Sequence, residues 1–209
     1  MFDGLNNDQT KGAIMKISKA IKGVWNYTWG NLFSHFMYDK KYLDSKWFKN
    51  KHKGIGAIGW NWVLADAAGR LFFKTNVGVP FPVSPKVIIS NPKNIHFDVD
   101  DLNNFQTQGN YYQAIGNAHI HIGKGTWIAP NVGIITTNHD VNDLDKHQEG
   151  KDVVLGEGCW IGMNSVILPG VVLGPKTIVG AGSVVTKSFE HGHCVIAGNP
   201  AKIIRQLDK

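Results

Sequence analysis

One histidine in a polar stretch is the first residue whose setting could support chemistry. His139 stands between Asn138 and Asp140 in the segment "IITTNHDVNDLDKH". An imidazole titrates near neutral pH, so it can accept a proton from one group and return it to another. The simpler alternative is a solvated loop histidine whose two polar neighbours only shape a turn.

Aliphatic residues recur at every sixth position on both sides of this segment. A period of six fits a short strand followed by a turn, so that three strands close one triangular coil. We therefore predict a mainly β protein, a parallel β-helix, with an inward aliphatic residue and an inward small or β-branched residue on each side. The aliphatic series is Ile122, Ile128 and Ile134, then Leu155, Ile161, Ile167, Leu173, Val179 and Val185; the second series is Cys159, Ser165, Val171, Thr177 and Ser183.

The repeat loses its register at the histidine segment. Ile134 and Leu155 are separated by 155 − 134 = 21 positions, which is not a multiple of six. A regular coil presents side chains only from its flat faces, whereas a loop that leaves the coil can reach across a gap. We therefore expect a protruding loop over residues 139–153 that carries His139.

The chain divides into an N-terminal helical and capping region (1–85), the β-helix (86–198) and a short C-terminal helix (199–209). Asn199 and Pro200 suit the first positions of that last helix. Residues 47–85 mix short apolar runs with glycines and predict strands and turns. Residues 9–28 predict an amphipathic helix with most lysines off its apolar stripe. The stripe is expected either to pack on the main domain or to contact an anionic membrane surface; its residues are Ile14, Ile17, Ile21 and Val24.

Composition restricts the class of protein. Apolar residues form 43% and charged residues 18% of 209 residues, which is typical of a globular chain. The formal charge of +6 is not accompanied by a nucleic-acid-binding motif, so no nucleic acid partner is expected. Cys159 and Cys194 lack metal-ligand spacing, which favours reduced thiols in a cytoplasmic protein, with the inner face of the membrane as an additional location. No secretory leader or membrane-spanning run is expected.

The hexads, together with "IAPNV", "NHD", "CWIG", "ILPGV", "GAGSVVTK" and "AGNPAKII", resemble the hexapeptide-repeat acyltransferases. The resemblance covers about residues 105–207 and is nearest to galactoside, maltose and surface-polysaccharide O-acetyltransferases. It implies a left-handed β-helix, a homotrimer with active sites between subunits, acetyl-CoA as donor, a sugar or glycan acceptor and no metal. His139 would be the general base on the protruding loop.

The same resemblance assigns the remaining candidate residues. On the acceptor side, Asn117 stands where relatives carry an acidic residue, which implies recognition of sugar hydroxyls without charge. Met163 replaces a hydroxyl that some relatives carry, so that a backbone N–H would have to stabilise the oxyanion. The further supporting or acceptor-binding candidates are Asn138, Asp140, Asn110, Gln113 and His147; the coenzyme candidates are Trp160, Gly162, Met163, Ala181, Thr186, Lys187, Lys202 and Arg205.

Three alternatives remain beside acetylation of a sugar hydroxyl in surface, capsular or lipopolysaccharide synthesis. An N-acetyltransferase acting on a nucleotide-linked amino sugar shares the chemistry, although residues 1–85 show no strand–glycine–helix phosphate loop. A γ-class carbonic anhydrase would use His119, His121 and His139 as zinc ligands; the first two alternate in "HIHI" and should point outward together. A non-catalytic repeat scaffold would make no use of His139.

Overall fold

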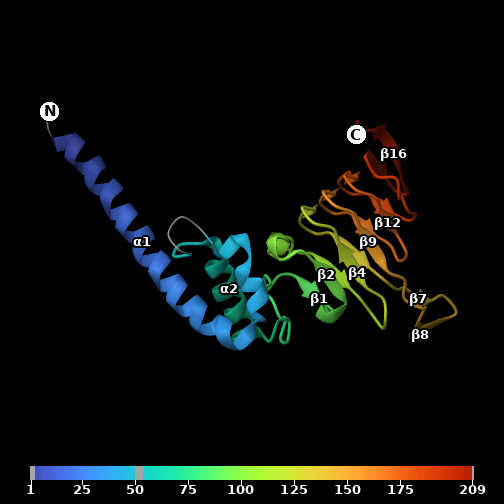
Figure 1. Ribbon diagram of the computed structural model, residues 1–209, viewed down its shortest axis with the longest axis horizontal. Helices are drawn as coiled ribbons and strands as arrows, with labels where there is room; N and C mark the ends of the chain where they lie inside the picture. The colour runs from blue at the N-terminus through green and yellow to red at the C-terminus, as the bar shows by residue number, and fades with distance from the viewer. Residues whose placement is uncertain (1–2, 50–53, 209) are drawn as a thin grey trace.

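The structure is a computed structural model that describes residues 3–49 and 54–208, with side chains from residue 9 onward. Its N-terminal part is helical, with α1 (Asp3–Met37) followed by the short helices η1 (Lys40–Asp44) and η2 (Lys46–Phe48), and then by α2 (Ile58–Phe73). The rest of the chain winds into a stack of coils. Figure 1 shows that α1 extends away from this stack at one end. None of the described helices is long and apolar enough to cross a bilayer.

Three sheets form the sides of the coiled part. Sheet A contains the strands β1-β3-β6-β11-β14, sheet B contains β12-β9-β4-β2, and sheet C contains β16-β15-β13-β10-β5. Every pairing in these sheets is parallel except that of β16 with β15. The predicted parallel β-helix is confirmed.

The strand bounds follow the hexad positions. They are β1 (Ile88–Ile89), β2 (Ile95–Phe97), β3 (Tyr111–Gln113), β4 (Ile120–Ile122), β5 (Trp127–Ile128), β6 (Gly133–Ile135), β9 (Val153–Leu155), β10 (Trp160–Ile161), β11 (Val166–Ile167), β12 (Val172–Leu173), β13 (Ile178–Val179), β14 (Val184–Val185), β15 (Cys194–Gly198) and β16 (Ala201–Gln206), with the short helices η3 (Pro92–Asn94) and η4 (Val99–Phe105) in the first coils. In chain order the sheets follow B, C, A from β4 to β14. One regular coil takes 18 residues, because Val154 pairs with Val172 and Trp160 with Ile178.

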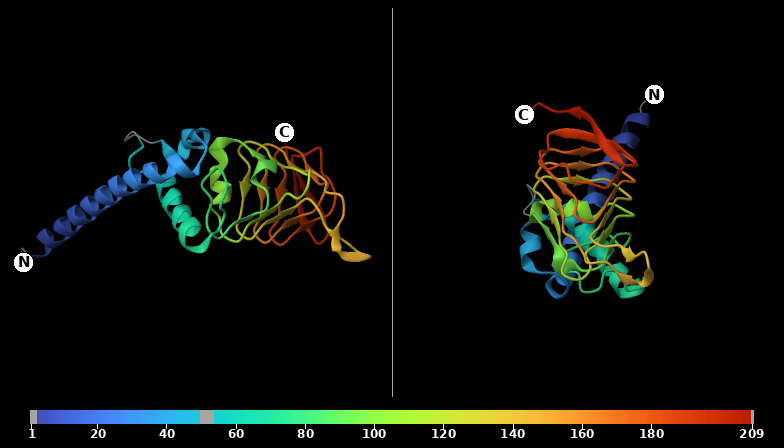
Figure 2. Two further views of the ribbon diagram at one scale, coloured as in Figure 1. Left: turned by 90° about the horizontal axis from the view of Figure 1, so that it is seen from below. Right: turned by 90° about the vertical axis from the view of Figure 1, so that its right-hand side faces the viewer.

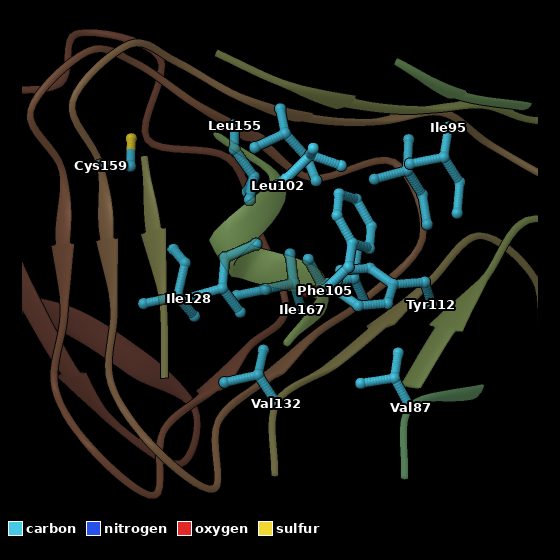
Figure 3. Close-up of a cluster of buried hydrophobic side chains, with 14 of the residues drawn as sticks. Val87, Ile95, Leu102, Phe105, Tyr112, Ile128, Val132, Leu155, Cys159 and Ile167 are labelled. Atoms are coloured by element: carbon cyan, nitrogen blue, oxygen red, sulfur yellow. The ribbon is translucent and has the colours of Figure 1, made fainter. Parts of the chain in front are cut away.

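The inward side chains close the interior as the hexads predict. All six aliphatic residues from Leu155 to Val185 are at most 1% exposed, and so are the five small residues between them. Their hydroxyls satisfy turn carbonyls: Ser183 donates to the carbonyl of Gly180 and Thr177 to that of Gly174. Figure 3 shows side chains from several sides of the coil pointing toward one another. Burial of this aliphatic column is the main stabilising contribution to the coil.

The predicted C-terminal helix is wrong. Residues 201–206 form β16, which turns back and pairs antiparallel with β15. β15 would otherwise end sheet C with unpaired backbone groups on one edge, and pairing with β16 satisfies them. Strand pairing with β15 therefore outweighs the local helix-start signal of Asn199 and Pro200.

The strands predicted for residues 47–85 are also wrong in part, since α2 spans sixteen of these residues; residues 50–53 lie outside those described. Its glycines are contact points and not turn residues. A Cβ on Gly59 would lie 2.6 Å from the Phe48 ring, and a Cβ on Gly69 would lie 2.7 Å from Pro85. The glycines therefore permit close packing within a helix, which the sequence pattern concealed.

α1 continues past Thr28, where the sequence predicted its end. The Thr28 hydroxyl donates to the carbonyl of Val24, so this polar side chain is satisfied within the helix. Beyond it, Gly30 packs against Trp60 of α2, and both Gly30 and Ser34 are buried. The packing prediction for the apolar stripe is wrong for this chain, because Ile14, Ile17 and Ile21 are 59–64% exposed.

A buried polar network fastens the helical part to the chain that enters the coils. The Asp66 carboxylate accepts hydrogen bonds from the Tyr38 hydroxyl at 2.8 Å, from Arg70 at 2.8 and 3.1 Å, and from the Val83 amide at 3.1 Å. Arg70 also donates to the carbonyl of Phe81. Burial raises the pKa of the Tyr38 hydroxyl, so it remains a donor at neutral pH.

Candidate active site

A β-hairpin leaves the coil at the break in the repeat. Its strands are β7 (His139–Asp140) and β8 (Asp143–His147), which pair antiparallel with His139 opposite His147. The chain departs after β6 of sheet A and returns at β9 of sheet B. The hairpin therefore replaces the corner between these two sheets, and Figures 1 and 2 show it projecting from the stack.

A backbone carbonyl of the hairpin determines which imidazole nitrogen of His139 carries a hydrogen. Its Nδ1 lies 2.6 Å from the carbonyl oxygen of Leu144, and a carbonyl can only accept. Nδ1 therefore carries the hydrogen, and in the neutral ring Nε2 is left with a free lone pair. The side chain is exposed. This tautomer is the one that can remove a proton from an incoming hydroxyl.

The neighbours of His139 have roles that the sequence did not separate. The imidazole of His147 packs on that of His139, with ring centroids 4.4 Å apart. The Asp140 carboxylate accepts from the Asn142 amide, which shapes the turn, and the carbonyl of Asn138 accepts from the Gln148 amide. Since the Leu144 carbonyl occupies Nδ1, neither side chain orients the imidazole at that nitrogen.

The acceptor candidates of the preceding coil separate into exposed and buried residues. Asn117 is exposed at the corner between β3 and β4, one coil before the corner from which the hairpin leaves. Asn110 is fully buried, donates to Thr107 and accepts from the Val132 amide, so its predicted contact with an acceptor is wrong. The Gln113 side-chain oxygen accepts from the amides of residues 136 and 137 and so anchors the departing strand.

Three histidines gather on the outer face of sheet B, beside the base of the hairpin. Nε2 of His96 lies 2.8 Å from Nδ1 of His119, and the ring centroids of His96 and His121 are 4.7 Å apart. Asp152 accepts from the His119 amide and lies 3.9 Å from His121. Burial, followed by the charges of His121 and His119, lowers the pKa of His96. The sequence missed His96 and Asp152, because only strand register brings them together.

His119 and His121 point outward together, as expected from "HIHI", with ring centroids 5.9 Å apart. Within residues 9–49 and 54–208, however, no group of three or more His, Cys, Asp or Glu side chains is arranged to hold a metal ion. The zinc arrangement of the carbonic anhydrase alternative therefore receives no support from the described part of the chain.

The outer face of sheet C carries a row of large residues next to a row of small ones. Strand register aligns Trp127 with Trp160, then with Ile178, Val195 and Arg205. The adjacent row consists of Ala129, Gly162, Gly180 and Ala197, and it ends at Lys202. Neighbouring strands lie about 4.8 Å apart, so each row is a continuous strip along several coils. We call the two rows together the sheet C strip.

The glycines of the sheet C strip cannot carry side chains. A Cβ on Gly162 would lie 2.6 Å from the backbone of residues 179 and 181, and one on Gly180 would lie 2.9 Å from Ala197. Trp160 beside them is 55% exposed. The result is a shallow surface, with an aromatic side chain at one edge, on which an extended ligand can approach the backbone closely.

A bulge places the two basic residues of β16 on one face. Lys202 pairs with Ala197 and Arg205 with Val195, and the register shifts between Val195 and Ile196. Without this shift, positions 202 and 205 would point to opposite faces, because side chains alternate along a strand. Their predicted association therefore survives the loss of the predicted helix. Both are exposed at the end of the sheet C strip.

The remaining coenzyme candidates lie at two different corners of the coil. Met163 and Ala181 stand at the corner that joins sheets C and A, where the Gly182 amide donates to the Met163 carbonyl. Thr186 and Lys187 follow β14 at the corner between sheets A and B, the corner from which the His139 hairpin also departs. In a three-sided coil that corner lies opposite sheet C. Figures 1 and 2 show the hairpin and β16 on different sides of the stack.

Comparison with known proteins agrees with this fold. The family model of the bacterial transferase hexapeptide (six repeats) matches residues 152–187. A Dictyostelium discoideum protein is 36% identical over 145 residues, which are 68% of this chain and 72% of that protein. Its name describes it as an inferred acetyltransferase. Galactoside O-acetyltransferase of Escherichia coli K12 is 35% identical over 129 residues, and the match covers 60% of this chain and 61% of that enzyme.

A solved galactoside acetyltransferase in complex with coenzyme A is 29% identical, covers 59% of this chain and 63% of that chain, and superposes with a TM-score of 0.44. The coiled architecture and the hexad repeats define a hexapeptide-repeat transferase. The chain belongs to the family of hexapeptide-repeat acetyltransferases, on the basis of the family match and the relatives described above.

Proposed function

We propose that this protein transfers an acetyl group from acetyl-CoA to a hydroxyl group of a sugar, with His139 as the general base. The observation that carries the proposal is the hydrogen bond from Nδ1 of His139 to the Leu144 carbonyl, on a hairpin that leaves the coil. This hydrogen bond leaves Nε2 free to accept the proton of the sugar hydroxyl while the hydroxyl oxygen attacks the thioester carbonyl. The same nitrogen can return this proton to the thiolate that departs.

The sheet C strip is the proposed coenzyme site. Its small residues allow a pantetheine arm to lie along the backbone, Trp160 can cover the arm, and Lys202 and Arg205 can meet phosphate oxygens with charged hydrogen bonds. Met163 and Ala181 border the strip at its corner. When bound, acetyl-CoA supplies the activated acetyl group.

A trimer is part of the proposal. His139, Thr186 and Lys187 belong to the corner opposite the sheet C strip, so one chain alone would not bring the proposed base and the proposed coenzyme site together. A cyclic trimer would place the hairpin of one subunit beside the strip of its neighbour. We also expect the coil to be left-handed, as the family resemblance implies.

The acceptor is proposed from the relatives and from polar residues beside the hairpin. The names of two relatives, from Escherichia coli and Lactococcus lactis, specify O-acetylation of a galactoside. In this chain, the exposed amide of Asn117 and the imidazole of His147 are suited to hydrogen bonds with sugar hydroxyls. We propose a sugar of a surface or capsular polysaccharide or of lipopolysaccharide as the acceptor class.

Release of coenzyme A thiol across a panel of sugars and glycan repeat units tests the proposal. His139→Ala should lower kcat by about 10²–10⁴-fold, which is the usual contribution of a general base. His191→Ala is the matched control, because His191 is an exposed histidine of a turn outside the hairpin. NMR of the product separates an ester from an amide. Failure to bind coenzyme A would refute acetyl transfer, and full turnover by His139→Ala would refute the base.

A further inference from the structure

The N-terminal helix presents its apolar stripe to solvent. The stripe continues beyond Ile14, Ile17 and Ile21 through further large side chains, all of them exposed to 38% or more. Figures 1 and 2 show the first half of α1 extending past the rest of the molecule. Contiguous exposed apolar surface of this length marks an interaction site. Val24, already part of the stripe, is exposed likewise, and the further members are Trp25, Trp29, Leu32 and Phe36.

The stripe faces away from the body of the protein. α1 contacts α2 through Tyr27, whose ring meets that of Trp60, and through Gly30, where a Cβ would lie 2.9 Å from the same ring. At about 100° per residue, Tyr27 and Gly30 lie on the face opposite Ile14, Ile21 and Leu32. Rotation of α1 therefore cannot bury the stripe without breaking the α1–α2 contact.

The charge on α1 is of one sign over most of its length. Lys11, Lys16, Lys19 and Lys22 lie in residues 9–38, a segment that contains no Asp or Glu. All four lysines are exposed. By the same helical spacing, Lys11 and Lys22 border the stripe, whereas Lys16 and Lys19 lie farther around the helix. Cations that border an apolar face are placed to meet anionic headgroups.

A second copy of the helix fits this surface less well. Ile14, Ile17, Ile21 and Val24 have heptad spacing, but Thr28, Asn31 and His35 occupy the next positions of the same seam. The apolar seam thus lasts two heptads, below the three to four that indicate a coiled coil. Helices packed side by side along the stripe would also bring like charges together, since residues 9–38 supply no acidic partner. The exposed Trp25 and Trp29 suit the interface between lipid and water.

We propose that α1 lies on the surface of an anionic lipid bilayer, with its apolar stripe in the headgroup region and Lys11 and Lys22 in contact with lipid phosphates. The surface is independent of the acetyl-transfer site, which lies on the coils. It would hold the enzyme at the bilayer while leaving the His139 hairpin and the sheet C strip in water.

Flotation of the full chain with lipid vesicles tests the proposal. Vesicles of phosphatidylcholine with about 30% phosphatidylglycerol should carry the protein, and pure phosphatidylcholine should bind it about tenfold or more weakly. Raising the salt concentration should release it. Ile17→Asn combined with Ile21→Asn should abolish flotation, because polar side chains would then replace the centre of the stripe.

A matched pair of variants separates contact from overall charge. Lys11→Gln with Lys22→Gln should reduce flotation more than Lys16→Gln with Lys19→Gln, although both remove two charges. Equal flotation on both vesicle types, or flotation by the isoleucine variant equal to that of wild type, would overturn the proposal. So would a change in oligomeric mass in the isoleucine variant without loss of flotation, because the stripe would then serve subunit contacts. Thiol release with a water-soluble sugar acceptor should be unchanged in all these variants, which separates a failure of this proposal from a failure of acetyl transfer.

Discussion

Two inactive variants should restore activity when they share one trimer. His139→Ala removes the proposed base, and Trp160→Glu removes the indole that would cover the pantetheine arm and puts a hydrated carboxylate in its place on the sheet C strip. His139 and Trp160 belong to opposite sides of one coil. If each active site combines the hairpin of one subunit with the strip of the next, a mixed trimer can contain an intact site that neither homotrimer has.

The size of the recovery follows from cyclic symmetry. A trimer of two subunits of one variant and one of the other has three directional interfaces, and one of them joins an intact His139 to an intact Trp160. Mixed trimers should therefore show about one third of wild-type turnover, with an unchanged KM. Trp160 is 55% exposed, so its replacement should leave folding intact.

Co-expression with two different affinity tags, followed by purification on both, isolates the mixed trimers for a thiol-release assay. Each variant alone should be inactive, and each should retain the thermal unfolding midpoint of wild type. Mixed trimers without activity would refute the shared site and indicate that base and coenzyme meet within one chain. Activity well above one third would contradict the assumption that both residues are required.

Three further outcomes follow from the described contacts. Asp66→Ala leaves the Arg70 guanidinium buried without its partner, so the free energy of unfolding of the helical part should fall by about 3–5 kcal/mol. Hydrogen exchange should show this loss in α1 and α2. Asp66→Leu with Arg70→Met should recover only part of it, because the Tyr38 hydroxyl and the Val83 amide still lose their acceptor. The fold lowers the pKa of His96 from its ordinary value of 6.5, so His96 binds a proton more readily in the unfolded chain than in the folded one. The melting temperature should therefore fall as the pH drops from about 7.5 to about 5, and it should fall less in His96→Asn. Identical pH profiles for wild type and His96→Asn would contradict this coupling. Arg205→Ala should raise the Kd for coenzyme A about tenfold by calorimetry, with the exposed Lys93→Ala as the unchanged control.

The sequence alone determined the repeating core of this protein. Leu155, Ile161 and their equivalents recur at a spacing that fits a three-sided coil, and the structure buries each of them. The same count located the place where the chain leaves the coil, because an extra segment between β6 and β9 breaks the period. Periodicity is a local property of the chain, so it can be read without knowing which segments meet.

Tertiary structure decided everything that depends on segments far apart in the sequence. β16 forms because it pairs with the otherwise unpaired edge of β15. Glycine is required at positions 59 and 69 of α2 because the Phe48 and Pro85 side chains leave no room for a Cβ there. The hydrogen-bond partner of His139 is a backbone carbonyl, which every residue has, so residue types alone could not predict it. The apolar stripe of α1 was visible in the sequence, but its direction was not, since helical spacing fixes which residues share a face and only packing against α2 fixes where that face points.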